Sequence, residues 1–311
     1  MSAMSGKVYD VAVIGAGIGG LTAATYLAKA GLRVVVVERG EKVGGYCGTF
    51  ERSGYRFDEA VHYLNNLGPN GFLRAICEEL GINGALQVVT VDPSDRLLLP
   101  DMQIAIYHDV ERTISELSEQ FPEEAEDLRR FFGLVSGFEF TQIYVQYKGK
   151  TFQQLLDGFF KNQKLKTALG LLATTLGLAP DRLSALGALA YYRGSVLDGG
   201  YHPVGGAQSL SNALCERLVA LGGEVRLRKQ VERIVIKSGQ VDGIVLKGGE
   251  EICSDAVVSN ADATQTLERL VGTEHAGGGL IERVRAMKPS TSNLVVYLGV
   301  STSLVGRVAD C

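Results

Sequence analysis

The chain has 311 residues, of which 46% are hydrophobic and 21% charged, and its formal net charge is −4. This composition fits a globular protein with a sizeable core, and because no basic run exceeds two residues we expect no nucleic-acid partner. Five widely spaced cysteines and four scattered histidines form no metal-binding pattern, and the odd number and wide spacing of the cysteines predict a reducing compartment, here the cytoplasm.

The first predicted elements are a strand over residues 8–14, a glycine turn, and a helix that ends before Gly31. A second apolar run over residues 34–37 predicts another strand, and Glu38 stands at its end. A strand, a glycine turn, a helix and a second strand ending in a carboxylate together predict a dinucleotide site. The turn consists of Gly15, Ala16, Gly17, Ile18, Gly19 and Gly20.

The residues of this turn have separate expected roles. Gly15 permits the tight turn, Gly17 lets the backbone approach a pyrophosphate, and Gly20 lets the helix pack close to the strand. The phosphates would lie at the helix N-terminus, and Glu38 would accept a hydrogen bond from a ribose hydroxyl. An ordinary βαβ core with a glycine turn is the alternative. Residues 11–28 carry no charge, but their glycines and strand-like start argue against a membrane span.

A second glycine pair, Gly44–Gly45, follows soon after Glu38, and a plain nicotinamide site does not need it. The stretch Gly54-Tyr55-Arg56-Phe57-Asp58 comes next and leads to His62. Disulfide reductases of related fold carry two cysteines just after such a pair, whereas Cys47 stands alone, so we expect it to be a small buried residue. No second GxGxxG pattern occurs, which argues against a separate NAD(P)H domain.

The middle of the chain has the pattern of a mixed α+β region. Helices are predicted over residues 70–80, from an N-cap at Asp109, and from Pro122 onward, and strands over residues 86–90 and 96–106. Residues 167–180 are uncharged, rich in leucine and preceded by Lys161, Lys164 and Lys166. This stretch is too short to span a bilayer. It is either a buried core helix or a helix that rests on a membrane surface at the mouth of an apolar tunnel.

Further glycine pairs follow at 199–200 and 205–206. After them, leucines at helical spacing predict a helix that ends at Gly222–Gly223. Strands are predicted over residues 224–227, 231–234 and 256–259, and the last of these leads into Asn260 and Ala261. The apolar segment Leu294–Val300 predicts one more strand.

In this order, the motifs resemble the FAD-dependent phytoene desaturase, carotenoid isomerase and retinol saturase group of the amine-oxidase-like flavoproteins. The resemblance covers most of the chain. It implies an α/β fold in which a Rossmann-like FAD-binding domain, with a parallel sheet plus a β-meander, carries an inserted α+β substrate domain. The implied boundaries are residues 1–65 and 199–270 for the FAD-binding domain, and residues 66–198 and 271–311 for the substrate domain.

The resemblance also implies a set of site residues. Gly44–Gly45 would let the chain pass close to the ribityl-pyrophosphate region of FAD, and the backbone at Val231 would contact adenine. His62 is the catalytic candidate, as a polar group near the flavin ring, with a structural hydrogen bond as its alternative role. No metal is expected. The implied FAD-binding residues are Gly15, Ala16, Gly17, Ile18, Gly19, Gly20, Glu38, Arg39, Gly44, Gly45, Tyr46, Val61, His62, Val231, Asn260 and Ala261.

The implied reaction is hydride transfer between an apolar polyene, such as a carotenoid or retinoid, and flavin N5. Carotenoid cis–trans isomerisation and a non-catalytic flavoprotein remnant are the alternatives. Members of the group continue well past position 311 with a glycine-rich closing segment, and nothing after Val271 supplies it. We therefore expect a truncated chain that binds FAD weakly and turns over little by itself. A homo-oligomer, a complementing partner chain and peripheral membrane contact remain open.

Overall fold

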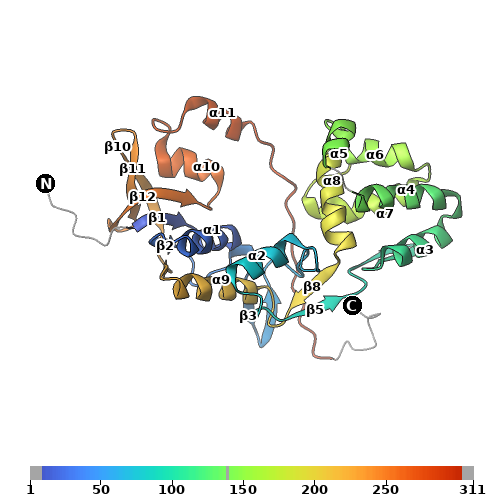
Figure 1. Ribbon diagram of the computed structural model, residues 1–311, viewed down its shortest axis with the longest axis horizontal. Helices are drawn as coiled ribbons and strands as arrows, with labels where there is room; N and C mark the ends of the chain where they lie inside the picture. The colour runs from blue at the N-terminus through green and yellow to red at the C-terminus, as the bar shows by residue number, and fades with distance from the viewer. Residues whose placement is uncertain (1–8, 138–139, 303–311) are drawn as a thin grey trace. The chain divides into compact units, whose positions relative to one another are not determined.

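The computed structural model describes residues 9–137 and 140–302 (Figure 1). Their contacts divide them into two units. Unit 1 holds the residues up to His62, Ile76–Gln87 and Pro203–Lys288, and unit 2 holds Tyr63–Ala75, Val88–His202 and the residues from Pro289 onward.

A six-stranded sheet forms the centre of unit 1, in the order β10-β11-β12-β1-β2-β9. Strands β12, β1, β2 and β9 pair in parallel, whereas β10, β11 and β12 form an antiparallel meander. The expected parallel sheet with a β-meander is therefore confirmed. The strands are β1 (Tyr9–Ile14), β2 (Val34–Val37), β9 (Glu224–Arg226), β10 (Val231–Lys237), β11 (Gln240–Leu246) and β12 (Glu251–Ser259).

Strand β2 consists of four valines, all buried. A continuous apolar run of this kind suits a parallel strand that is covered on both faces. Helices α1 (Ile18–Lys29) and α9 (Gln208–Ala220) pack against each other in this unit (Figure 1). The hydroxyl of Thr25 in α1 donates to the carbonyl of Leu214 in α9, 3.4 Å away.

Two segments expected in the substrate domain lie in unit 1 instead. Residues 76–87 include the end of α2 (Phe72–Leu80), where Glu79 accepts a hydrogen bond from the Tyr26 hydroxyl of α1 at 2.8 Å. Residues 271–288 begin within the helical turns η5 (Thr266–Gly272), which pack on β10 through Leu270 and Val271. The boundaries differ because these contacts link segments far apart in sequence.

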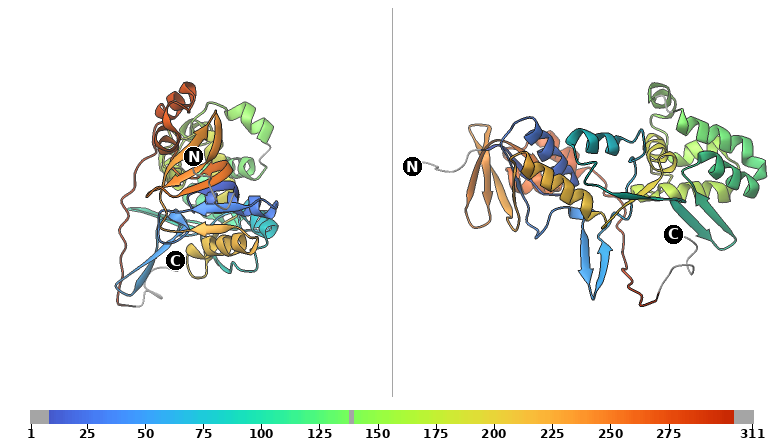
Figure 2. Two further views of the ribbon diagram at one scale, coloured as in Figure 1. Left: turned by 90° about the vertical axis from the view of Figure 1, so that its left-hand side faces the viewer. Right: turned by 60° about the horizontal axis from the view of Figure 1, so that its bottom comes forward.

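Unit 1 is completed by η1 (Gly45–Cys47), the β3 (Thr49–Arg52) and β4 (Tyr55–Asp58) hairpin, α10 (Ala263–Gln265) and α11 (Gly278–Arg285) (Figure 2).

Unit 2 is mostly helical and has the expected α+β character. Its core is built around aromatic side chains, with Phe131 in edge-to-face contact with Phe132, Phe160 and Tyr192. Its helical elements are α3 (Val110–Gln120), η2 (Pro122–Glu124), α4 (Ala125–Ser136), α5 (Phe140–Tyr147), α6 (Phe152–Phe159), α7 (Gln163–Leu172), η3 (Ala173–Leu176), α8 (Ala185–Tyr191) and η4 (Tyr192–Leu197). Its strands are β5 (Val88–Val91), which pairs with β8 (Gly200–Pro203), and β6 (Asp95–Leu99), which pairs with β7 (Met102–Ile106).

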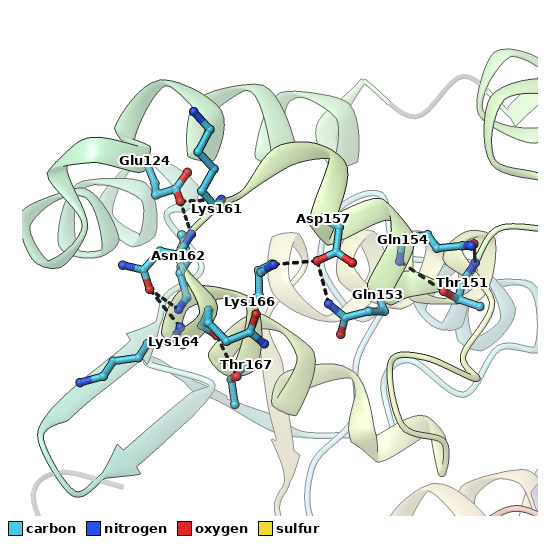
Figure 3. A network of polar contacts seen from close by, with 12 residues as sticks. Glu124, Thr151, Gln153, Gln154, Asp157, Lys161, Asn162, Lys164, Lys166 and Thr167 are labelled. Carbon is cyan, nitrogen blue, oxygen red and sulfur yellow. Dashed lines mark hydrogen bonds and ion pairs between the residues drawn. The ribbon is translucent and has the colours of Figure 1, made fainter.

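The start of α7 is fixed by a polar network (Figure 3). The carboxylate of Glu124, only 3% exposed, accepts hydrogen bonds from the backbone N–H groups of Lys161 at 2.7 Å and Asn162 at 2.5 Å. Asn162 is the N-cap of α7, and its side-chain oxygen accepts from the N–H of Lys164 at 3.0 Å. A buried carboxylate with two backbone donors is a structural group, because it satisfies amides that a helix start leaves unpaired.

The leucine-rich stretch 167–180 is not a single helix, since α7 ends at Leu172 and Gly177 has a φ of +77°. Lys164 pairs with Asp101. Lys166 pairs with Asp157 at 2.7 Å (Figure 3), so both lysines are engaged within unit 2. These contacts favour the core alternative, and contact with a membrane surface stays a prediction. Among the helices of the described residues, none combines the length and apolar character needed to cross a bilayer.

Two strand predictions need correction. The expected strand over residues 96–106 is a hairpin, because β6 and β7 are separated by a turn at Pro100 and Asp101. The segment Leu294–Val300 forms no strand in the described range, and Leu294 is 92% exposed. A continuous run of β-branched and other apolar residues favours extended backbone, but a strand also requires a partner to which its N–H and C=O groups can bind.

Candidate dinucleotide-binding site

The turn between β1 and α1 has the geometry that its glycines predict. Gly15 has a φ of +95°, and its N–H donates to the carbonyl of Val37 in β2 at 2.8 Å. A Cβ at Gly20 would lie 2.1 Å from the carbonyl oxygen of Gly15, closer than any side chain tolerates. Gly15 therefore permits the turn and Gly20 the close packing of helix on strand, whereas the approach of a pyrophosphate to Gly17 stays a prediction.

The N-terminus of α1 presents free backbone donors. The first intrahelical hydrogen bond runs from the N–H of Leu21 to the carbonyl of Gly17 at 2.9 Å, so Ile18, Gly19 and Gly20 have no intrahelical acceptor. Gly17 is the N-cap and no side chain caps α1, whose first turn, fully within the described residues, has no acidic side chain. Uncapped N–H groups and the positive end of the helix dipole favour an anion at this position.

Glu38 lies at the carboxyl end of β2 and turns its side chain back to the glycine turn. One carboxylate oxygen accepts from the N–H of Ala16 at 2.8 Å, and the other accepts from the N–H of Gly40 at 2.7 Å. The sequence predicts the position of Glu38, but not that both of its oxygens bind backbone amides. Its neighbour Arg39 is exposed.

The second glycine pair lies beside the first turn. The N–H of Gly44 donates to the carbonyl of Ala16 at 2.8 Å, and Gly17 and Gly44 form an isolated parallel bridge. A Cβ at Gly45, whose φ is +56°, would lie 3.4 Å from the Cα of Gly17. The two glycine-rich segments thus form one surface of bare backbone. Tyr46, the next residue, is 82% exposed.

Cys47 is the small buried residue that the sequence predicts. Its Sγ donates to the carbonyl of Ala207 at 3.3 Å, and burial raises the pKa of its thiol. A thiol with a raised pKa is a poor nucleophile, so it is unsuited to disulfide exchange.

Polar residues at the start of α9 hold this second segment, and the sequence analysis does not identify them. The Ser211 hydroxyl donates to the carbonyl of Cys47 at 2.8 Å, and the Gln208 side chain donates to the carbonyl of Val43 at 2.9 Å. At the N-cap of α9, the N–H of Ala207 donates to the carboxylate of Asp58 at 2.9 Å. Polar residues in the first turns of a helix resemble solvent-facing positions, so no local pattern marks them as supports of a turn some 160 residues away.

The chain returns to the glycine turn at the end of β12. The N–H of Asn260 donates to the carbonyl of Ile14 at 2.8 Å, so Asn260 and the exposed Ala261 follow directly beside the turn. Val231 is buried at the start of β10, in the core cluster that contains Val37. Nearby, the N–H of Lys229 donates to the carbonyl of Glu38 at 2.8 Å. The structure thus brings together the first glycine turn, the second glycine pair, the segment after β12 and the start of β10.

The positions of Val61 and His62 do not test their expected contacts with FAD. His62 is exposed and is the last residue before the chain passes into unit 2, and Val61 is half-buried. The expected role of His62 near a flavin ring therefore stays a prediction.

Comparisons with known proteins agree with this geometry. A sequence model described as flavin containing amine oxidoreductase matches residues 18–303. The chloroplastic prolycopene isomerase of Daucus carota is 26% identical over 98% of this chain and 54% of its own length. The all-trans-retinol 13,14-reductase of Homo sapiens is 27% identical over 93% of this chain and 53% of its own length. The chain thus spans about half the length of these curated relatives.

A solved structure supports the same fold. The crystal structure of an oxidoreductase from Methanosarcina mazei superposes with a TM-score of 0.71 at 23% identity, over 90% of this chain and 65% of that one.

Proposed function

Because this chain belongs to the family of flavin containing amine oxidoreductases, we propose that it is an FAD-dependent oxidoreductase acting on an apolar polyene. The observation that carries the proposal is the surface of bare backbone at the N-terminus of α1. There two glycine-rich segments lie together and are bordered by a carboxylate. Such a surface suits a ligand that combines a pyrophosphate with a ribose.

The residues present fit the ADP half of FAD. A pyrophosphate needs hydrogen-bond donors, which the free N–H groups after Gly17 provide. A ribose needs an acceptor. A carboxylate has about four lone-pair sites, so Glu38 can accept from a ribose hydroxyl while it holds its two backbone donors.

The residues of this chain then bind and orient, while bound FAD supplies an acceptor for hydride. The dipole of α1 offsets the charge of the pyrophosphate, and Glu38 fixes the ribose at the carboxyl end of β2. The backbone of Val231 remains the proposed contact for adenine, and His62 the proposed polar group beside the ring.

The substrate class rests on the relatives. Prolycopene and all-trans-retinol, named for the two relatives, are both apolar polyenes, which supports a polyene as the substrate of this chain. We propose hydride transfer between that polyene and flavin N5 as the reaction. Cis–trans isomerisation of a carotenoid is the second candidate, because the carrot relative is named as an isomerase.

The proposal is tested by titrating FAD into the purified chain and following the quenching of flavin fluorescence, with NADH as the competing ligand. We expect saturable binding of FAD, and loss of binding in Gly17→Val. Tight binding of NADH without affinity for FAD would overturn the assignment. The same titration measures the strength of FAD binding.

The reaction is tested by incubating the FAD-loaded chain, with its flavin either oxidised or chemically reduced, with prolycopene and with all-trans-retinol and measuring product mass. Desaturation lowers the mass of the product, reduction raises it, and isomerisation changes only its retention time. Unchanged substrates at full FAD occupancy would instead support a non-catalytic flavoprotein.

A further inference from the structure

A hollow in unit 2 is lined by side chains that donate hydrogen bonds. Residues of α4, α5 and α6 surround it, and its volume of about 190 Å³ is far more than the roughly 15 Å³ that one water molecule needs. Its polar lining consists of Arg130, Gln146, Tyr147, Lys150 and Gln154. Among the described residues that line it none is acidic, although the chain as a whole carries a net charge of −4.

The two cations of the hollow each lie against an aromatic ring. The guanidinium carbon of Arg130 is 5.5 Å from the centre of the Phe159 ring, and the Nζ of Lys150 is 5.3 Å from the centre of the Tyr147 ring. Arg130 also pairs with Asp127 at 2.5 Å, which occupies only one of its five N–H donors. Within the described part of the chain Lys150 has no ion-pair partner, so its charge is available to a ligand.

The backbone holds Lys150 beside the hollow. Its N–H donates to the carbonyl of Tyr147 at 3.0 Å, and its carbonyl accepts from the N–H of Ala185 at 3.0 Å. Thr151, the next residue, forms a capping box with Gln154, whose side-chain oxygen accepts from the N–H of Thr151 at 3.0 Å (Figure 3). Because that oxygen is engaged, the amide nitrogen of Gln154 remains as a donor.

Tyr147 adds a neutral donor to the two cations. It is only 6% exposed, and its hydroxyl makes no hydrogen bond to the residues that the structure describes. Burial raises the pKa of this hydroxyl, while the positive charge of Arg130 acts in the opposite direction, so the hydroxyl stays protonated at neutral pH. A hydroxyl without a partner in the fold needs water or a ligand as its acceptor.

Gly158 leaves one wall of the hollow open. It lies within α6, and a Cβ at this position would meet no atom within 4 Å. Packing therefore does not require a glycine, which is less favourable in a helix than any residue except proline. The glycine does, however, keep a side chain out of the hollow that it lines.

We propose that this hollow binds a phosphate group. A phosphate ester carries about two negative charges at neutral pH and has several acceptor oxygens, which match two cations accompanied by neutral donors. Arg130 supplies a planar fork and Lys150 a compact charge, the two forms in which side chains bind phosphate. The inference does not depend on the proposed function, because these residues belong to unit 2 and the glycine turn belongs to unit 1.

The test measures how fast an amine-reactive ester acetylates Lys150, resolved by mass spectrometry, in phosphate and in chloride of equal ionic strength. Lys148 is the matched control. Its Nζ lies 5.1 Å from the centre of the Tyr144 ring, much as Lys150 lies against Tyr147, but it does not line the hollow. We expect phosphate to slow the labelling of Lys150 and to leave that of Lys148 unchanged.

Two variants retain Lys150 as the reporter. Arg130→Gln should raise the phosphate concentration that half-protects Lys150 about tenfold, through loss of a charge-assisted hydrogen bond. Gly158→Leu should abolish the protection without changing any charge, because its side chain fills the hollow. Melting curves by circular dichroism verify that each variant folds, and Arg130→Gln alone still decides the test if Gly158→Leu does not.

The source of the phosphate is distinguished by two further probes, glycerol 3-phosphate and phosphatidylcholine vesicles with or without phosphatidic acid. Protection by glycerol 3-phosphate assigns the hollow to a small phosphate compound. Protection only by vesicles that contain phosphatidic acid assigns it to a lipid headgroup.

The inference is overturned if no probe protects Lys150, or if Lys148 is protected to the same extent. Undiminished protection in a folded Gly158→Leu chain, or in Arg130→Gln, would overturn it as well, because the phosphate would then bind outside the hollow.

Discussion

Replacing Glu38 with glutamine tests whether the candidate site is organised before its ligand arrives. The carboxylate joins the first glycine turn to the segment after β2, accepting from Ala16 at 2.8 Å and from Gly40 at 2.7 Å. Glutamine has the same shape but only one acceptor oxygen. In Glu38→Gln, therefore, one backbone N–H must face the side-chain NH₂ instead of an oxygen.

The magnitude follows from these two bonds. A hydrogen bond to a charged group contributes about 1.5–3 kcal/mol, and Glu38 is only partly buried, so water replaces part of the loss. We expect the free energy of unfolding of unit 1 to fall by about 1–2 kcal/mol. FAD binding should weaken by at least about tenfold, because the ribose loses a charged acceptor as well.

The assay is urea unfolding followed by circular dichroism, with and without FAD. Because the chain has two units, which can unfold in separate steps, hydrogen exchange at the amides of Ala16 and Gly40 assigns the effect to this turn. Glu41→Gln is the control: Glu41 pairs with Arg228 at 3.2 Å, but both side chains are largely exposed, so little change is expected.

The reasoning is refuted if Glu38→Gln unfolds at the wild-type urea concentration and its Ala16 and Gly40 amides stay protected. The two hydrogen bonds would then contribute nothing to the ligand-free turn. An equal loss of unfolding free energy in Glu41→Gln would also refute the reasoning, because a general effect of removing negative charge would then explain the result.

Three further predictions concern single groups. Gly20→Ala should lower the melting temperature and abolish FAD binding, because its Cβ would lie 2.1 Å from the Gly15 oxygen. Gly279→Ala, in the exposed and uncrowded α11, should instead stabilise by up to about 1 kcal/mol, and melting curves showing the reverse order would contradict this. Glu124→Ala should lower the urea-unfolding free energy by about 1–3 kcal/mol, because two backbone donors lose their acceptor, whereas unchanged unfolding would show that water replaces it. Cys47 should resist iodoacetamide at pH 8 until the chain unfolds, since its raised pKa keeps the thiol protonated, and rapid labelling of the folded chain, mapped by mass spectrometry, would count against this.

Local patterns in the sequence predict the elements that surround the candidate site. The strand predicted over residues 8–14, described as β1 (Tyr9–Ile14), the helix after Gly17 and the strand ending at Glu38 follow from periodicity and turn chemistry, which act over a few residues. The N-cap role of Asp109 is confirmed for the same reason, since its side chain accepts from the N–H of Glu111 two residues later. The fold class was predicted from the resemblance of these motifs, in their order, to a known family.

Long-range contacts could not be predicted in the same way. Nothing near Ser211 in sequence indicates that its hydroxyl supports the backbone at Cys47, and nothing near Asn260 indicates that its amide lies beside Gly19. The pairing of Lys164 with Asp101 likewise depends on how α7 and the β6–β7 hairpin pack within unit 2.

The segment Leu294–Val300 is a case in which the local sequence predicts a strand that the described structure does not form. Its composition favours a strand, yet within the described residues it forms no regular secondary structure and is largely exposed. The sequence by itself thus determined the glycine turn and the position of Glu38, because each depends on the conformational preferences of neighbouring residues, whereas the fold class was implied by the resemblance to a known family. The tertiary structure alone decided which polar groups support that turn and which strands pair, because those contacts join residues that the chain brings together only on folding.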